Sequence, residues 1–211
     1  MSLLSLVKRT VRRTAFGLRF DRTGAAATEF ALVATPLMIA LLGAFDLGYQ
    51  AYLHSVVQGA LNDVARTASL EAPELNCTGT TVVAQVACAI KRRSDIVARS
   101  ATYEVRIRNY FDFAGVGRSE KLVTDYNGNG RYDPGDCFID LNENRVFDTN
   151  AGREGVGSGD DVVFYEVTVR MPRLFPIHQF ISASPNYAIR GETAIRNQPY
   201  TRQRVPPTAC I

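Results

Sequence analysis

A twelve-residue segment, residues 125–136, carries oxygen-bearing side chains at the spacing of a calcium loop. Its ligand positions 1, 3, 5, 7, 9 and 12 hold, in order, Asp125, Asn127, Asn129, Arg131 (through its carbonyl), Asp133 and Asp136. Gly130 occupies the turn position 6, and alternate spacing lets short side chains converge on one ion. The segment therefore predicts a structural calcium ion. The alternative interpretation is a pair of Asx turns, in which the same side chains bond the backbone.

The pattern recurs fifteen residues downstream, where the corresponding residues are Asp140, Asn142, Asn144 and Asp148. Arg145 replaces the turn glycine and Ala151 occupies position 12, so this second loop is the weaker match. Two copies in register favour at least one bound calcium. We expect that ion to order the long segment 113–160, for which the sequence shows no other means of ordering.

Four cysteines lie beyond the N-terminal apolar run, at Cys77, Cys88, Cys137 and Cys210. An even number outside the cytosol suggests two disulfides. Four cysteines allow three pairings; Cys77–Cys88 is the local one and would leave Cys137–Cys210. No Cys-x-x-Cys pair and no His at ligand spacing supports a zinc site.

The composition is that of a folded chain with a basic N-terminal segment. The 211 residues are 46% apolar and 21% charged, which suits one domain or two small ones and excludes wholesale disorder. Residues 1–24 carry six basic side chains and one acid, whereas the remainder carries 18 basic and 20 acidic side chains. No basic patch persists through the body, so we expect a targeting leader and no nucleic-acid partner.

Residues 25–45 form an apolar run with one charge, Glu29. A bilayer core requires about 20 apolar residues in a helix. The basic leader immediately before the run predicts a cytoplasmic N-terminus by the positive-inside rule. We expect three regions: a cytoplasmic leader 1–24, a transmembrane half-helix 25–46 and an extracytoplasmic domain 47–211. A secretory signal peptide is the alternative, but the residues around Ala44 make a weak cleavage site.

Gly24 stands at the junction of leader and apolar run, with Glu29 five residues later and Phe30 next. This arrangement resembles the processing site of type IVb pilins of the Flp/Tad type, although Tyr is more usual at the place of Phe30. The stretch to Leu70 resembles the TadE-like minor pseudopilins. The resemblance implies that a prepilin peptidase cuts between Gly24 and Ala25. It also implies that Glu29 offsets the N-terminal ammonium of a neighbouring subunit, because opposite charges in a low-dielectric filament core need each other.

Several elements must position these sites. Apolar residues at spacings of three and four predict one long helix over 26–69, interrupted in its hydrogen bonding by Pro36. Its second half has a mostly apolar stripe of Leu47, Ala51, His54, Val57, Leu61, Val64 and Ala68. A second helix is predicted at 82–99, and period-two alternation predicts strands at 104–110, 163–171 and 187–196. Together they predict an α+β, pilin-like fold with a small antiparallel sheet and a long calcium-loop-like insertion.

The sequence contains no nucleophile elbow, no phosphate-binding glycine loop with Lys and no Cys/His pair, so we expect no enzymatic activity. The resemblance implies a minor pseudopilin or assembly component of a Tad-type pilus. Its partners would be the membrane, the prepilin peptidase, other pilins and Tad-type assembly proteins. Its place would be the bacterial inner membrane, with a periplasmic body, or the pilus at the cell surface. The alternative is an uncleaved single-pass membrane protein whose calcium-braced outer domain is an adhesin or assembly scaffold.

Overall fold

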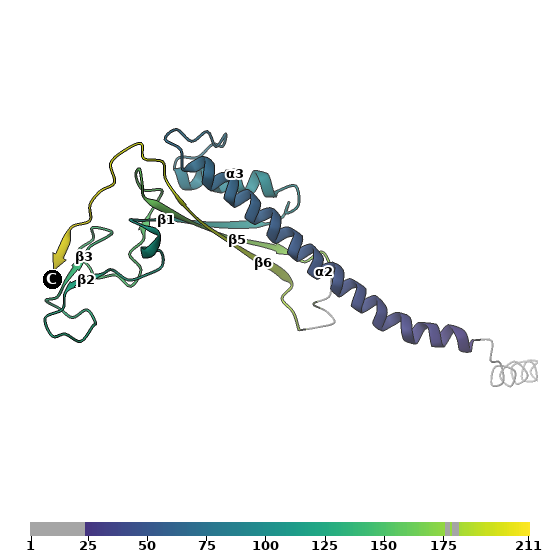
Figure 1. The fold of residues 1–211 in the computed structure, drawn as a ribbon. Helices are drawn as coiled ribbons and strands as arrows, with labels where there is room; N and C mark the ends of the chain where they lie inside the picture. Colours follow the sequence, from purple (N-terminus) through teal and green to yellow (C-terminus); the bar gives the residue numbers. More distant parts are fainter. Residues whose placement is uncertain (1–23, 176–177, 179–181) are drawn as a thin grey trace, which may run out of the picture. The chain divides into compact units, whose positions relative to one another are not determined.

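The computed structural model describes residues 24–175, 178 and 182–211, so the predicted leader lies outside the described residues except for Gly24. The chain divides into two compact units, residues 1–46 and 47–211. One helix, α2 (Ala25–Ala68), runs through the boundary between them (Figure 1). Its ends lie within one residue of the predicted ends, and each unit is described by itself.

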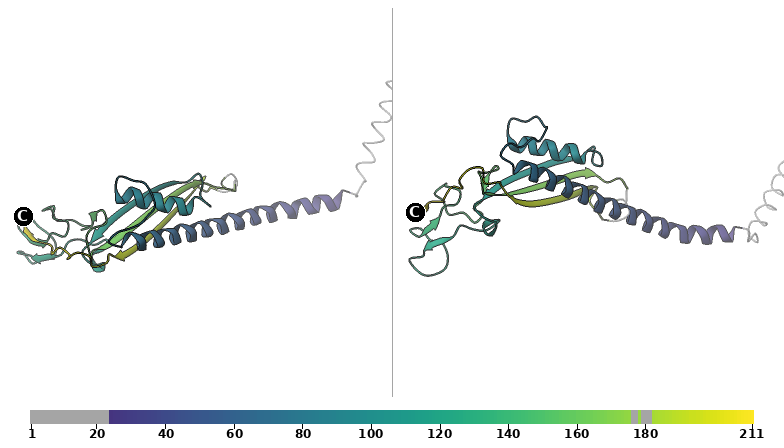
Figure 2. Two further views of the ribbon diagram at one scale, coloured as in Figure 1. Left: turned by 90° about the horizontal axis from the view of Figure 1, so that it is seen from above. Right: turned by 45° about the horizontal axis from the view of Figure 1, so that its top comes forward.

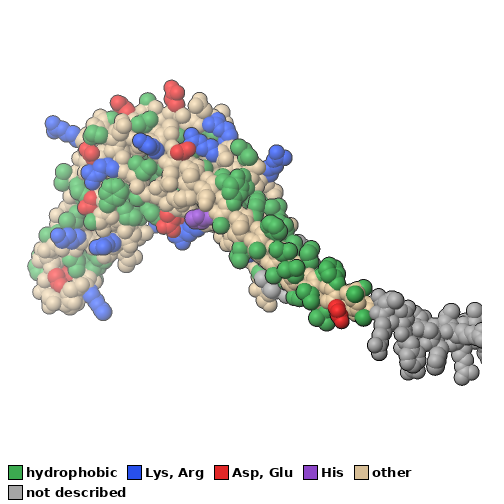
Figure 3. Space-filling view, turned by 45° about the vertical axis from the view of Figure 1, so that its right-hand side comes forward, with side chains coloured by type: hydrophobic (Ala, Val, Ile, Leu, Met, Phe, Trp, Pro, Cys, Tyr) green, Lys and Arg blue, Asp and Glu red, His purple; other side chains and the backbone are tan. Residues whose placement is uncertain are grey.

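The described part of the first unit is the N-terminal half of α2, whose large apolar side chains are exposed. They are Phe30, Leu32, Val33, Leu37, Met38, Ile39, Leu41 and Phe45. Figure 3 shows hydrophobic side chains gathered along this half of the helix. Among the described residues, α2 is the one helix long and apolar enough to cross a bilayer. Pro36 lies inside it and cannot donate to the carbonyl of Leu32, four residues earlier.

The second unit is built on a four-stranded antiparallel sheet in the order β4-β1-β5-β6. The strands are β1 (Thr102–Tyr110), β4 (Arg153–Glu154), β5 (Val162–Pro172) and β6 (Asn186–Arg196). All three predicted strands are confirmed, each one or two residues longer than expected. The sequence did not predict the short strand β4, because two residues are too few to show period-two alternation.

Alternation along β5 determines which face of this sheet becomes the core. Val163, Tyr165, Val167, Val169 and Met171 are buried, whereas the side chains between them are half-buried or exposed. The buried set packs with residues of α2 and of the second helix, which lies beside α2 in Figures 1 and 2. The α+β arrangement predicted from the sequence is therefore confirmed.

The core-facing stripe of α2 begins later than predicted. Val57, Leu61, Val64 and Ala68 are buried as expected, and Leu53 joins them. By contrast, the first three residues of the predicted stripe, Leu47, Ala51 and His54, are exposed.

The second helix, α3 (Val82–Ser94), begins where Thr81 caps it, because the Thr81 hydroxyl accepts the backbone N–H of Ala84 at 3.2 Å. It ends five residues before the predicted position 99, with Asp95 as its C-cap. Val97 and Ala98 both donate to the Ser94 carbonyl, so the chain turns there instead of continuing the helix.

A second, three-stranded sheet was not predicted. It has the order β2-β3-β7, formed by β2 (Leu122–Thr124), β3 (Cys137–Ile139) and β7 (Thr208–Cys210). A short 3-10 turn, η1 (Phe113–Gly115), precedes it. The insertion 113–160 therefore has backbone pairing of its own, which the sequence did not reveal, and the two calcium-type segments lie around this sheet.

Candidate metal-binding loops and N-terminal helix

The first loop is organised by Asp125, which precedes the turn. Its Oδ1 accepts the N–H of Gly128 and its Oδ2 accepts the N–H of Gly130, both at 2.7 Å. Gly128 and Gly130 have φ of +69° and +73°, a conformation that glycine adopts without steric cost. The turn therefore wraps around the carboxylate at position 1.

Two asparagine side chains occupy the interior of this turn. The Oδ1 atoms of Asn127 and Asn129 accept the N–H groups of Asn129 and Arg131, at 3.0 and 2.7 Å. Their amide groups both donate to Oδ2 of Asp133, at 2.7 and 2.6 Å. These bonds, first from Asn127 and then from Asn129, lower the pKa of Asp133 below its usual value.

Asp136 closes the first loop from position 12. Its Oδ1 accepts the N–H of Tyr126 at 3.0 Å, and its Oδ2 accepts the N–H of Asp133 at 2.9 Å. The side chain is only 3% exposed. The sequence-predicted residues of this loop are thus brought together in one turn.

The second loop repeats most side-chain bonds of the first. Its position-1 carboxylate, Asp140, accepts the N–H groups of positions 5 and 6, from Asn144 (3.1 Å) and Arg145 (2.8 Å), whereas Asp125 accepts those of positions 4 and 6. The amides of Asn142 and Asn144 both donate to Oδ2 of Asp148, at 2.6 and 2.7 Å. Glu143 and Arg145 have φ of +60° and +61° at the positions where the first loop has its two glycines. The second loop adopts the same turn although its sequence lacks both glycines.

The position-12 role in the second loop belongs to a residue that the sequence analysis missed. Glu120 accepts the N–H of Leu141 at 2.8 Å and that of Asp148 at 3.1 Å, and it is 3% exposed. Burial is the largest cause that raises its pKa above the usual value. Glu120 lies twenty residues before Asp140, outside any loop spacing, so no local signal could have identified it.

The loops touch through their position-8 aromatic residues. The rings of Tyr132 and Phe147 stack with centroids 4.6 Å apart and planes 4° apart. Phe138 of β3 meets both rings edge-on, at 5.4 and 5.5 Å. This cluster holds the two turns against the small sheet.

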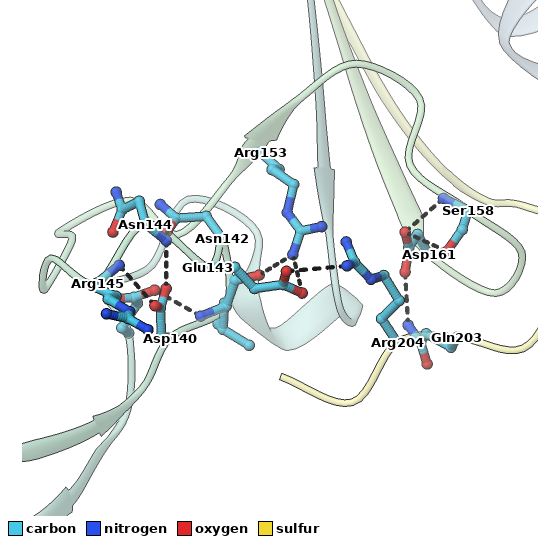
Figure 4. A network of polar contacts seen from close by, with 12 residues as sticks. Asp140, Asn142, Glu143, Asn144, Arg145, Arg153, Ser158, Asp161, Gln203 and Arg204 are labelled. Atoms are coloured by element: carbon cyan, nitrogen blue, oxygen red, sulfur yellow. Dashed lines mark hydrogen bonds and ion pairs between the residues drawn. The ribbon is translucent and has the colours of Figure 1, made fainter. Parts of the chain in front are cut away.

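Ion pairs connect the second loop to its surroundings. Glu143 pairs with Arg153 of β4 at 3.1 Å and with Arg204 at 3.2 Å (Figure 4). Arg153 also donates to the carbonyl of Leu141 at 3.0 Å. Asp161, immediately before β5, accepts from Ser158 and from Gln203 in the same view. The C-terminal segment is thereby held to the second loop and to the residue before β5.

The donor chemistry of the loops suits a hard cation, because every side-chain ligand candidate is an oxygen. Each asparagine Oδ1 accepts one N–H and retains a second lone pair. In the part of the chain that the structure describes, no three His, Cys, Asp or Glu side chains gather as a metal-holding group. A cation in either loop would therefore depend on amide and backbone oxygens as well as on carboxylates. The observed hydrogen bonds are also those of Asx turns, so both interpretations agree with them.

Of the three possible pairings, the two disulfides follow the one that contains the local bridge between Cys77 and Cys88. They join Cys77 to Cys88, across 11 residues, and Cys137 to Cys210, across 73 residues. The first ties the segment before α3 to the helix. The second joins directly paired residues of β3 and β7.

At the other end of the described chain, the Gly24–Ala25 peptide bond lies at the start of α2. The N–H of Thr28 donates to the Gly24 carbonyl at 3.1 Å, and the Thr28 hydroxyl donates to the Ala25 carbonyl at 2.8 Å. Glu29 and Phe30 follow in the first turns and are both exposed.

This helical segment also coincides with a family model. Residues 24–66 match the TadE-like protein family. The matched segment begins at Gly24 and ends two residues before α2 does, so it confirms the resemblance inferred from the junction residues. No curated protein and no solved structure matches the chain.

The TadE-like segment, residues 24–66, contains Gly24, Ala25, Glu29 and Phe30, whereas both loops lie outside it. An apolar helix in a TadE-like segment fits a single-pass membrane protein of a pilus system.

Proposed function

We propose that this chain is a minor pseudopilin or assembly component of a Tad-type pilus. The observation that carries the proposal is the coincidence of three features in one segment. The TadE-like match begins at the predicted processing glycine, it covers the apolar half of α2, and that half is exposed. An apolar helix without covering side chains needs lipid or other helices around it.

The proposed assembly proceeds through α2. The chain inserts with residues 1–24 in the cytoplasm, a prepilin peptidase cuts after Gly24, and the mature chain begins at Ala25. Glu29 then lies in the second turn of the helix, where its carboxylate can pair with the new N-terminal ammonium of a neighbouring copy or pilin. Within the described residues Glu29 forms no ion pair, so its charge is available for that contact. An unpaired carboxylate within a membrane costs roughly 2.5–3.5 kcal/mol on insertion scales.

The outer domain 47–211 is proposed to be braced by calcium as well as by its disulfides. The support is the turn of residues 125–136, which gathers the predicted oxygen donors around Asp125. The ion would cross-link the turn and fix the small sheet beside it. Titration of the full-length chain with calcium tests this proposal, and absence of any bound calcium would contradict it.

The N-terminus of the protein extracted from membranes is the first experiment, by intact mass and terminal sequencing. We expect a chain that starts at Ala25. A start at Met1 or Ser2, in cells that process their other prepilins, would contradict processing. It would favour the uncleaved single-pass protein whose outer domain acts as an adhesin or scaffold. A start near Ala44 would identify a secretory signal and overturn the membrane assignment.

A further inference from the structure

An open groove of about 650 Å³ lies on the domain 47–211, where the turn η1, the end of β3 and the C-terminal segment meet. Its lining is largely apolar and includes Phe111, Ala114, Ile139, Leu141, Val205 and Pro206. Val205 is 84% exposed and Phe111 is 37% exposed. Apolar side chains that gather in an open groove and remain exposed mark a surface that another molecule covers.

Hydrogen bonds hold the exposed wall of this groove in place. The Gln203 amide donates to the carbonyl of Phe111 at 2.5 Å. The N–H of Asp140 donates to the carbonyl of Pro207 at 2.9 Å. These two bonds lie on either side of Val205 along the chain, so the C-terminal segment is fastened to the other two walls at both ends. The groove is therefore formed before anything binds in it, as binding sites usually are.

The exposed charges of the groove are both positive. Arg118 and Lys121 line it and are exposed, and within the described residues neither side chain forms an ion pair or a hydrogen bond. Two acids also line the groove, but both accept backbone N–H groups. Asp112 is half-buried and caps η1, and Glu120 is 3% exposed with both oxygens bonded to the second loop. Two cations beside an apolar groove complement a partner that is apolar and acidic.

We infer that this groove docks a segment of a partner protein in which an apolar side chain stands beside acidic ones. The apolar side chain would pack against Phe111 and Val205, and its acidic neighbours would pair with Arg118 and Lys121. An apolar anchor within a charged rim is the usual arrangement of a protein interface. A fatty acid suits the groove less well, because small-ligand pockets bury roughly 70–90% of their ligand, whereas Val205 in the wall is itself 84% exposed. The inference goes beyond the proposed function and does not depend on cleavage after Gly24.

The test is photo-crosslinking of the full-length chain in the cells that make it, with p-benzoylphenylalanine substituted for Val205. We expect an adduct to one protein, whose crosslinked peptide, identified by mass spectrometry, has acidic side chains next to the attachment point. The same substitution for Ile96, which is 82% exposed and outside the groove, should not give this adduct. Arg118→Glu combined with Lys121→Glu should lower the adduct yield by roughly tenfold or more. Arg99→Glu reverses an exposed cation outside the groove and should leave the yield unchanged.

Every other outcome overturns the inference. No adduct from position 205, or the same adducts from positions 205 and 96, would show that the groove is not a docking site. An acyl chain in the adduct would identify a lipid site. A crosslinked peptide without acidic side chains, or an unchanged yield after charge reversal, would contradict the charge pairing. If the doubly reversed chain fails to form both disulfides, Arg118→Gln with Lys121→Gln decides in its place. An acidic adduct from a chain that still begins at Met1 would retain the docking groove and overturn only the processing.

Discussion

Tyr165, in the middle of β5, is a buried polar residue of the core. Its side chain is fully buried, and its hydroxyl has no hydrogen-bond partner within the described residues. Burial raises its pKa above the usual value of 10.0, with a smaller contribution from Tyr200. An unsatisfied hydroxyl in a core destabilises the fold. Replacing this hydroxyl with hydrogen should therefore change the free energy of unfolding little.

We expect Tyr165→Phe to leave the free energy of unfolding at pH 7 unchanged or to raise it by up to about 1 kcal/mol. In the folded native chain the pKa is raised, so the unfolded chain loses its phenolic proton first. Stability should therefore fall as the pH rises above about 10. Denaturant titrations from pH 7 to pH 11 should show a smaller alkaline loss in Tyr165→Phe. A variant that loses more than about 1 kcal/mol at pH 7 would mean that the hydroxyl has a partner.

Single residues are also where sequence interpretation was weakest. Asp125 to Asp136 could be read from spacing, because one turn of chain contains all of them. Glu120 could not, because it reaches the second loop through the pairing of β2 with β3. Arg145 stands where the first loop has its turn glycine, and the structure holds it at a φ of +61°, a conformation that the sequence alone does not predict.

At the scale of elements, the two halves of α2 differ in the exposure of their apolar side chains. Its first half exposes large apolar side chains, whereas its second half buries Leu53, Leu61 and Val64 against the sheet. Periodicity identified the whole helix, since both halves keep helical spacing. It placed the start of the buried stripe too early, at Leu47, because an apolar residue on a helix can face lipid or the core with the same spacing.

The proposed role of Glu29 belongs to this element. Glu29→Gln should remove the charge pair between subunits, so incorporation into pili should fall at least tenfold while membrane insertion is retained. Membrane fractionation and immunoblots of sheared pili measure the two quantities. Glu71→Gln makes the same change at an exposed acid outside the TadE-like segment and should behave as the native chain. Normal incorporation of the Glu29→Gln chain would show that the charge is dispensable.

Within the domain 47–211 as a whole, the two disulfides span different lengths of chain. Cys77–Cys88 is local, whereas Cys137–Cys210 ties the end of the described chain to the small sheet. Removing Cys137 and Cys210 together, as serines, should destabilise the small sheet by roughly 2–4 kcal/mol. Limited proteolysis should then cut within 122–148 and 197–211 and spare β1, β5 and β6. The matched pair Cys77→Ser and Cys88→Ser should open only the segment before α3. Equal cleavage patterns in the two double variants would contradict a local role for each bridge.

The larger sheet could be predicted from the sequence because β1, β5 and β6 have nine to eleven residues each, long enough to display alternation. The small sheet could not, because its three strands have three residues each. Its third strand, β7, also comes from a distant part of the chain. Such pairing is stabilised by the disulfide and by contacts of Ile211, whose carbonyl accepts from Gly135, and none of these is a local signal.

The position of β7 also sets an order of assembly in time. In the proposed topology the domain 47–211 would cross the membrane with its N-terminal side first. Strand β3 lies between β2 and β7, so it has one neighbour until residues 208–210 have arrived. During that interval the thiol of Cys137 would remain unpaired. Cys77 and Cys88 are only 11 residues apart and can join as soon as both have emerged, which removes the two competing thiols before Cys137 meets Cys210.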